Sequence, residues 1–137
     1  MDNILLKKVS IIERCLLRIE EHKSSIENLA NDYDKQDIIV LNLERAIQAC
    51  IDCAQYIVKQ NKLGIPQFSR EAFDLIEKKG IIKAELSIRL KKMVGFRNIV
   101  VHSYQDLNIE ILEQILANEL SIFTEFSTSV IDYAKTK

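Results

Sequence analysis

The chain has 137 residues, of which 47% are hydrophobic, and its 19 basic and 20 acidic residues give a net charge of −1. This length suits a single domain, residues 1–137, and three glycines with one proline are too few for a many-turned β-sandwich. The composition favours a few long helices, and the near-neutral charge argues against a protein that attracts nucleic acid through its overall field.

Apolar residues recur at steps of three, four and seven from Asn3 to about Ala30, which predicts one long amphipathic helix. A second helix is expected to follow an Asp34 N-cap and to continue to about Asn61. Gly64 is expected to take the left-handed conformation that ends this helix.

A short third helix is predicted from an N-cap at Ser69 to a terminal glycine at Gly80, with an acidic residue early and lysines late. The fourth helix is expected from about Lys83 to His102 or Ser103. A fifth is expected from an Asn108 cap to about Ala134. Together these elements predict an all-α, up-down bundle of four long helices plus one short helix.

The cysteines and the N-terminal residues indicate the cellular compartment in which the protein is expected. Cys15, Cys50 and Cys53 are an odd number, which argues against a disulfide framework and favours a reducing cytoplasm. Charged residues such as Lys7 and Glu13 interrupt the apolar N-terminal residues, so neither a signal peptide nor a membrane span of about 20 residues is expected. We therefore expect a soluble, cytoplasmic protein with no membrane contact.

The fourth predicted helix ends in a polar cluster that holds one of the two histidines. At about 100° per residue, Asn98 and His102 share one edge of this helix, about 100° and 140° from Arg97. Arg97 and Tyr104, seven residues apart, stack on the other edge. A solvated helix face rarely carries this mixture.

Two sets of apolar residues surround the cluster. Val94 and Val101 are expected between its two edges, whereas Phe96, Ile99 and Val100 form a separate stripe that can face a core. We therefore expect one face of the helix to pack inside the chain. The valine-edged polar face is expected to line a pocket or to contact a second chain.

The order Arg97, four residues, His102, one residue, Tyr104, with Asn98 directly after the arginine, resembles the Arg-X4-His-X-Tyr signature of HepT-like toxins. These toxins belong to the HEPN superfamily of small helical ribonucleases. Residues 43–52, LERAIQACID, are similar to the long second helix of that family. The resemblance covers nearly the whole chain and implies a HEPN-like fold.

The resemblance also implies an activity: the toxin of a type VII HEPN/MNT toxin–antitoxin system. Such a protein is a metal-independent endoribonuclease that cuts tRNA or mRNA at a composite site in a homodimer, leaves a 2′,3′-cyclic phosphate and needs no cofactor. His102 would transfer protons, because histidine titrates near neutrality, and Arg97 would bind the phosphate. Asn98 would hold His102 or a phosphate oxygen.

Tyr104 is, by the same resemblance, the residue to which a cognate MNT-type nucleotidyltransferase antitoxin attaches AMP. The added charge and bulk beside Arg97 would block phosphate entry. Other interpretations remain open. His102 could be a packed, satisfied imidazole and Tyr104 an interface aromatic. The chain could be a noncatalytic HEPN module that binds nucleotide or substrate for a nucleotidyltransferase, or a helical scaffold without a ligand.

Two further features of the sequence are ambiguous. From Glu77 to Arg97 there are seven basic and two acidic residues, which could guide RNA or could equally be the solvated side of a helix. Cys50 and Cys53 have the spacing of a zinc or redox pair, but without a second pair we expect small core residues and no metal. Four polar residues of the second helix are left without an assigned role: Glu44, Arg45, Gln48 and Asp52.

Overall fold

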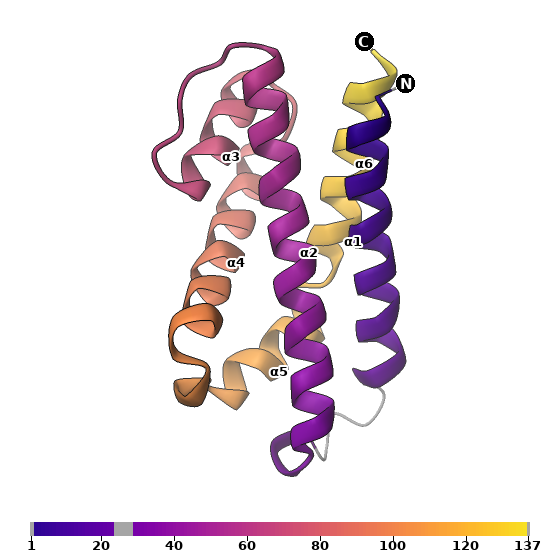
Figure 1. Ribbon diagram of the computed structural model, residues 1–137, viewed down its shortest axis with the longest axis vertical. Helices are drawn as coiled ribbons and strands as arrows, with labels where there is room; N and C mark the ends of the chain where they lie inside the picture. The colour runs from indigo at the N-terminus through magenta and orange to yellow at the C-terminus, as the bar shows by residue number, and fades with distance from the viewer. Residues whose placement is uncertain (1, 24–28, 137) are drawn as a thin grey trace.

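The computed structural model describes residues 2–23 and 29–136. Its helices are α1 (Asn3–His22), α2 (Tyr33–Gln60), α3 (Ser69–Lys78), α4 (Ala84–Ser103), the 3-10 turn η2 (Tyr104–Asp106), α5 (Ile109–Asn118) and α6 (Ser121–Lys135). Helices α1, α2, α4 and α6 alternate in direction, and no strand occurs among the described residues (Figure 1). The predicted all-α, up-down bundle is confirmed.

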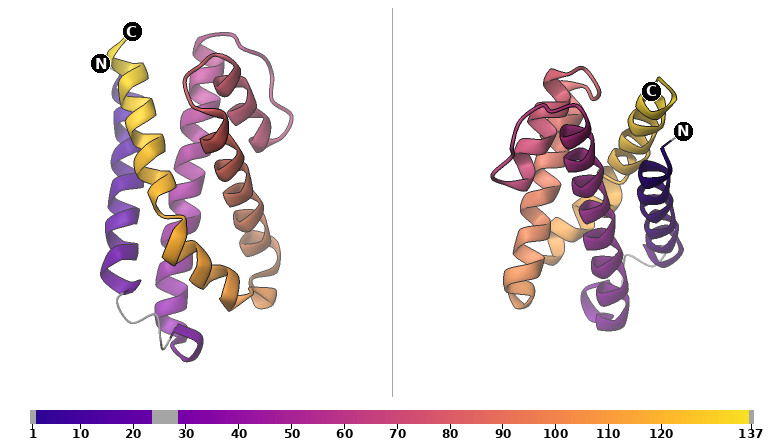
Figure 2. Two further views of the ribbon diagram at one scale, coloured as in Figure 1. Left: turned by 180° about the vertical axis from the view of Figure 1, so that it is seen from behind. Right: turned by 45° about the horizontal axis from the view of Figure 1, so that its top comes forward.

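The first and last predicted helices differ in length from the structure. Helix α1 ends at His22, and residues 24–28 of the predicted helix lie outside the described residues. The predicted fifth helix is two helices, which separate at Glu119 and Leu120. Helix α5 starts near the end of α4 and crosses the end of the bundle, and α6 then runs back along α1 (Figure 2). Neither glycine nor proline marks this break in the sequence, so local signals did not predict it.

The caps of the central helices also differ from the predictions. Asp32, rather than Asp34, caps α2, since its carboxylate accepts the backbone N–H of Lys35 at 3.0 Å. Ser69 is the first residue of α3 rather than its cap; Phe68 holds the cap position without a side-chain hydrogen bond. The cap of α5 is as predicted, because Asn108 accepts the N–H of Glu110 at 2.8 Å.

Of the two glycines predicted to end helices, Gly80 does so and Gly64 does not. Gly80 has a φ of +84°, and the N–H of the following Ile81 bonds to the carbonyl of Ile76 at 3.0 Å, as in a Schellman cap. At the end of α2, however, Lys62 takes the left-handed conformation, with a φ of 52°. Gly64 lies two residues beyond it, so its predicted role as the cap is wrong.

The core runs between the four long elements and includes the fully buried rings of Phe73, Phe123 and Phe126. The rings of Phe73 and Phe126 meet edge to face, with centroids 6.0 Å apart. Cys50 and Cys53 are buried free thiols, and burial raises the pKa of Cys53 to about 12. They are therefore small core residues, and the described part of the chain contains no group of three or more possible metal ligands.

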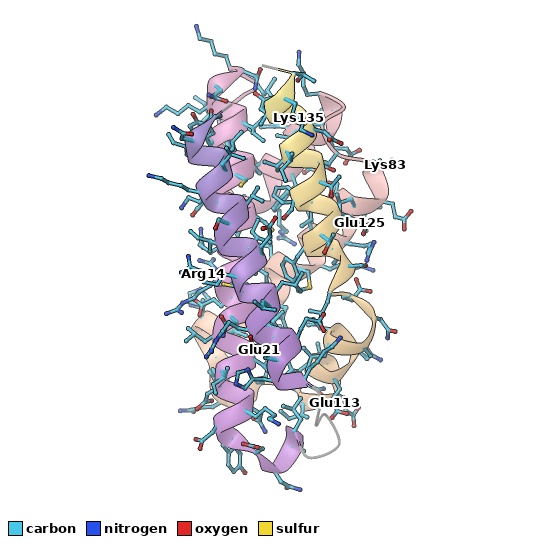
Figure 3. All side chains as sticks on the ribbon, turned by 90° about the vertical axis from the view of Figure 1, so that its right-hand side faces the viewer. Arg14, Glu21, Lys83, Glu113, Glu125 and Lys135 are labelled. Carbon is cyan, nitrogen blue, oxygen red and sulfur yellow. The ribbon has the colours of Figure 1, made fainter. Side chains whose placement is uncertain are left out.

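Charged side chains cover the outer faces of α1 and α6, among them Arg14, Glu21 and Lys135 (Figure 3). None of the described helices is both long enough and apolar enough to cross a membrane. The start of α1 and the end of α6 lie together at one end of the bundle, and η2 lies at the opposite end (Figure 1).

Candidate active site

Helix α4 carries three of the four predicted site residues, Arg97, Asn98 and His102, and its buried face is centred on the side of Arg97. Val94 is therefore in the core, with 1% of its surface exposed, and does not flank an open polar face as predicted. Phe96 and Val100 are buried as expected. Ile99 is 48% exposed, so its predicted place in the core stripe is wrong. Arg97 itself is half-buried at the contact between α4 and α2.

A chain of polar contacts from three helices holds the guanidinium of Arg97. Its Nη2 donates to Oε1 of Gln48 at 2.5 Å, and Nε2 of Gln48 donates to Asp52 at 2.8 Å. Lys8 of α1 pairs with the other oxygen of Asp52 at 3.1 Å. Because Asp52 accepts a hydrogen bond from the side-chain amide N–H of Gln48, the side-chain oxygen of Gln48 is turned toward Arg97.

Asn98 contacts Arg97 rather than His102. Its side-chain oxygen accepts from Nη1 of Arg97 at 3.2 Å, so the predicted bond between Asn98 and His102 is absent from the described structure. Two of the five N–H donors of the guanidinium are thus used within the chain, and Nε is buried without a partner among the described residues. The group retains donors for an anion.

His102 lies in the last turn of α4 and is exposed. It makes no hydrogen bond or ion pair with any described residue, so it is not satisfied within its own chain. The other histidine, His22, differs, because its Nδ1 bonds to the carbonyl oxygen of Arg18 at 2.8 Å. An exposed imidazole without a partner is free to exchange protons with a bound substrate.

Tyr104 begins η2, directly after α4, and its hydroxyl donates a hydrogen bond to Oδ1 of Asp37 on α2. The ring is 38% exposed. Burial, together with the hydrogen bond and the negative charge of Asp37, raises the pKa of Tyr104 to about 12. The hydroxyl is therefore protonated, held in one direction and reachable from solvent.

Several residues that contact the site were not assigned from the sequence. Gln48 and Asp52 orient Arg97, and Asp37 binds Tyr104. Glu44, half-buried, falls on the same face of α2, because positions 37, 44, 48 and 52 are spaced by seven, four and four residues. This spacing is a helical signal, but it identifies the site only once α2 is known to pack against α4.

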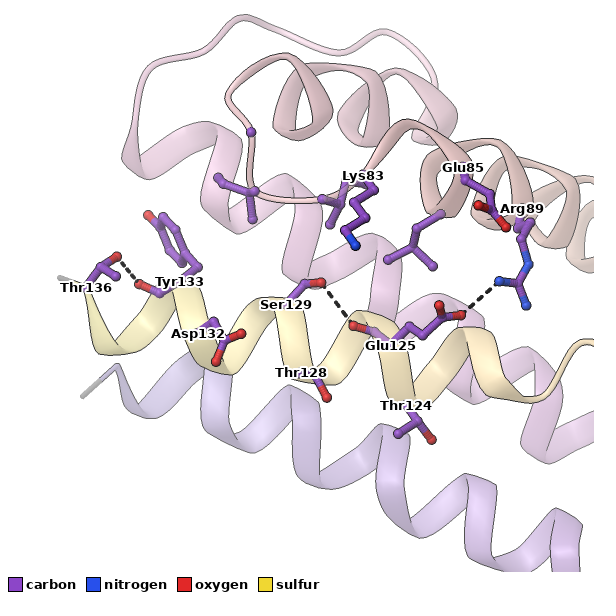
Figure 4. A pocket seen from close by; sticks show the side chains of 14 residues that line it. Lys83, Glu85, Arg89, Thr124, Glu125, Thr128, Ser129, Asp132, Tyr133 and Thr136 are labelled. Carbon is purple, nitrogen blue, oxygen red and sulfur yellow. Dashed lines mark hydrogen bonds and ion pairs between the residues drawn. The ribbon is translucent and has the colours of Figure 1, made fainter.

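A cavity of about 790 Å³ lies elsewhere, between the start of α4 and α6 (Figure 4), and none of the four predicted site residues lines it. At its edge Arg89 pairs with Glu125 at 2.8 Å. Lys91, also from the basic segment, pairs with Asp74 at 2.6 Å. The positive field expected from residues 77–97 is therefore partly neutralised within the chain.

Comparison with known protein families shows the family of this chain. The family described as Ribonuclease HepT-like matches residues 12–130. The chain belongs to this family. Among curated relatives in it, an mRNA nuclease HepT from Shewanella oneidensis is 42% identical over 126 residues, 92% of this chain and 95% of the relative. A tRNA nuclease HepT from Aphanizomenon flos-aquae is 27% identical over 106 residues, 77% of this chain and 72% of the relative.

Solved structures of the family have the same fold. A tri-AMPylated Shewanella oneidensis HEPN toxin in complex with an MNT antitoxin superposes with a TM-score of 0.92 at 40% identity, over 96% of this chain and 99% of that chain. A toxin–antitoxin complex with a tyrosine replaced by alanine gives a TM-score of 0.90 at 39% identity, over 95% and 99% of the two chains. The protein YutE from Bacillus subtilis, at 14% identity, shares the fold with a TM-score of 0.81, over 96% and 89% of the two chains. The predicted HEPN-like fold is confirmed.

Proposed function

We propose that this chain is a ribonuclease toxin of the HepT-like family that cleaves RNA, either mRNA or tRNA, without a metal ion. One observation carries the proposal: α4 presents the exposed imidazole of His102 five residues, about 7.5 Å of helix rise, after Arg97, whose guanidinium Gln48 of α2 holds in place. The relation to an mRNA nuclease over 92% of the chain supports the same activity. The three free thiols agree with the reducing cytoplasm that the sequence predicts.

The chemistry follows from an imidazole and a guanidinium. His102 takes the proton from the ribose 2′-hydroxyl, whose oxygen attacks the adjacent phosphorus, and the bond to the 5′-oxygen breaks as that oxygen is protonated. Arg97 stabilises the negative charge that accumulates on the phosphate oxygens. Asn98 supports Arg97 through their hydrogen bond. The products are a 2′,3′-cyclic phosphate and a 5′-hydroxyl.

The site is completed by a second copy of the chain. One protomer offers a single unpartnered histidine, whereas the reaction uses both a proton acceptor and a proton donor. Ile88, Gly95 and Ile99, spaced by seven and four residues, form an outward stripe on α4 that continues to His102. A homodimer that covers this stripe brings two copies of His102 together, as a two-fold interface does.

A nucleotidyltransferase antitoxin silences the chain by attaching AMP to Tyr104. The Shewanella relative supports this step, because it was solved as an AMPylated toxin bound to an MNT antitoxin. A tyrosine-to-alanine variant of such a complex supports a special role for a tyrosine. Tyr104 lies two residues beyond His102, so an adenylate there adds negative charge where the RNA phosphate would bind.

RNA cleavage by the purified chain in the presence of EDTA tests the proposal. We expect His102→Ala to lower the cleavage rate at least about 100-fold, because a general acid–base group contributes about 10²–10⁴-fold. His22→Ala is the matched control and should cleave at the wild-type rate, since His22 is bonded to its own helix. Both variants should keep the wild-type circular dichroism and dimer mass.

Equal cleavage by the His102→Ala and wild-type chains would refute the role of His102. A wild-type chain that binds RNA and leaves it intact, after the antitoxin has been removed, would instead favour the noncatalytic binding module.

A further inference from the structure

The hydrogen bond between Tyr104 and Asp37 has no part in RNA cleavage as proposed above. It joins the first residue of η2 to the second turn of α2, across 67 positions of the chain. Asp37 is exposed and Tyr104 is 38% exposed, so the pair lies at a surface that another protein can reach. No requirement of the core explains a carboxylate at this position.

Attack by a phenol on phosphorus requires the loss of its proton. With a pKa of about 12, Tyr104 is ionised in only about one molecule in 10⁵ at pH 7. The charge of Asp37 thus disfavours the free phenolate, but the same carboxylate is hydrogen-bonded to the proton that must leave. A base in that position can take the proton during the reaction itself.

We infer that Asp37 is the proton acceptor that this chain itself supplies for the modification of its own Tyr104. The inference rests on the proposed attachment of AMP at this site. The hydroxyl oxygen of Tyr104 attacks the α-phosphorus of a nucleoside triphosphate held by the antitoxin, and a new oxygen–phosphorus bond forms. The bond between the α-phosphorus and the bridging oxygen breaks, pyrophosphate leaves, and the phenolic proton passes to Asp37.

The carboxylate of Asp37 is the charged group that acts on the Tyr104 hydroxyl. Along the chain, the ionisable residues nearest to Tyr104 are His102 on α4 and Asp106 on η2, with Arg97 two turns earlier on α4, and those nearest to Asp37 are Asp34 and Lys35 on α2. Asp34 is exposed and precedes Asp37 by three residues on the same helix. It therefore offers a matched control, because replacing either aspartate by asparagine removes the same charge.

The initial rate of AMP incorporation by the cognate antitoxin, measured with radiolabelled ATP from pH 6 to pH 10, tests the inference. At pH 7 we expect Asp37→Asn to react at least about 100-fold more slowly than Asp34→Asn, which should remain within about twofold of wild type. The difference should shrink about tenfold per pH unit, because hydroxide can replace the missing base. Removing Asp37 also lowers the pKa of Tyr104, which favours this recovery. Asp37→Glu, which keeps a carboxylate, should restore part of the rate.

Three results would overturn the inference. Equal rates for Asp37→Asn and Asp34→Asn at pH 7 would show that Asp37 takes no part. A loss that is constant across the pH range would show that Asp37 serves docking rather than proton transfer. Incorporation of label into Tyr104→Phe as fast as into wild type would refute the attachment of AMP to Tyr104, and with it the role of Asp37. If Tyr104→Phe takes up no label, the comparison of Asp37→Asn with Asp34→Asn tests Asp37 alone.

Discussion

At the scale of single residues, the orientation of one amide decides where Arg97 points. Gln48 carries a donor and an acceptor on the same carbon, and Asp52 accepts from the donor. The oxygen is therefore left for Arg97, and Lys8 in turn holds Asp52. In the proposed reaction Gln48 is a positioning residue, because it would act on the phosphate only through Arg97.

Gln48→Leu should lower kcat/KM for RNA cleavage about 10–100-fold, since a catalytic group displaced by about 1 Å costs up to about 100-fold. The matched control is Gln55→Leu, an exposed glutamine of the same helix, which should cleave at the wild-type rate. Gln48→Glu keeps an oxygen toward Arg97 and should restore part of the activity. A purely structural role would instead show equal losses in Gln48→Glu and Gln48→Leu, matched by equal losses in melting temperature.

At the scale of elements, the end of α2 contains a strained residue. Lys62 has a φ of 52°, and its cap bonds run from Lys62 to Lys59 at 3.3 Å and from Leu63 to Val58 at 3.0 Å. The left-handed conformation costs a residue with a side chain about 1–2 kcal/mol, whereas glycine adopts it freely. The chain places its glycine two residues too late to relieve this strain.

Lys62→Gly should stabilise the fold by about 0.5–1 kcal/mol, because the relief of strain exceeds the extra entropy of glycine in the unfolded chain. Urea denaturation measures the change as a higher midpoint with an unchanged slope. Lys59→Gly, one turn earlier in the helical part of α2, should destabilise by about 1 kcal/mol. A lower midpoint for Lys62→Gly would mean that its side chain stabilises this end of α2 by more than the strain costs.

Local sequence signals predicted where the α-helices lie but not all of their ends. The 3-10 turn η2 was not predicted, and α5 and α6 were predicted as one helix. Asn108 and Gly80 act as predicted because their signals depend only on adjacent residues. No glycine or proline marks the break at Glu119, so local signals did not predict it. In the site, the spacing of Arg97 and His102 lies within one helix and could be read directly. Gln48, the partner of Arg97, and Asp37, the partner of Tyr104, could not, because these contacts depend on how α2 packs against the end of α4 and η2.

At the scale of the whole molecule, the proposed activity depends on the outer side of α4. Ile88 is 52% exposed and Ile99 is 48% exposed, and a side chain added at Gly95 would meet no atom within 4 Å. A second helix can therefore approach α4 closely at Gly95. The proposed dimer buries this stripe and joins two copies of the site, so assembly and catalysis should be lost together.

Ile99→Asp should convert the dimer to a monomer, because a charge placed in an apolar interface loses its hydration. Sedimentation measures the mass, and RNA cleavage should fall at least about 10-fold although Arg97 and His102 are intact. Leu17→Asp is the control: Leu17 is 59% exposed on α1 and should tolerate the change in both assays. A dimeric Ile99→Asp, or an active monomer, would refute this interface.

The meeting of the first and last helices at the end of the bundle away from η2 has a practical consequence (Figure 1). A fluorophore attached near the start of α1 and another near the end of α6 would sit side by side and report on unfolding of one chain. Neither label would obstruct RNA or an adenylating enzyme at the other end. A fused protein at either terminus should for the same reason leave the toxicity of the chain intact.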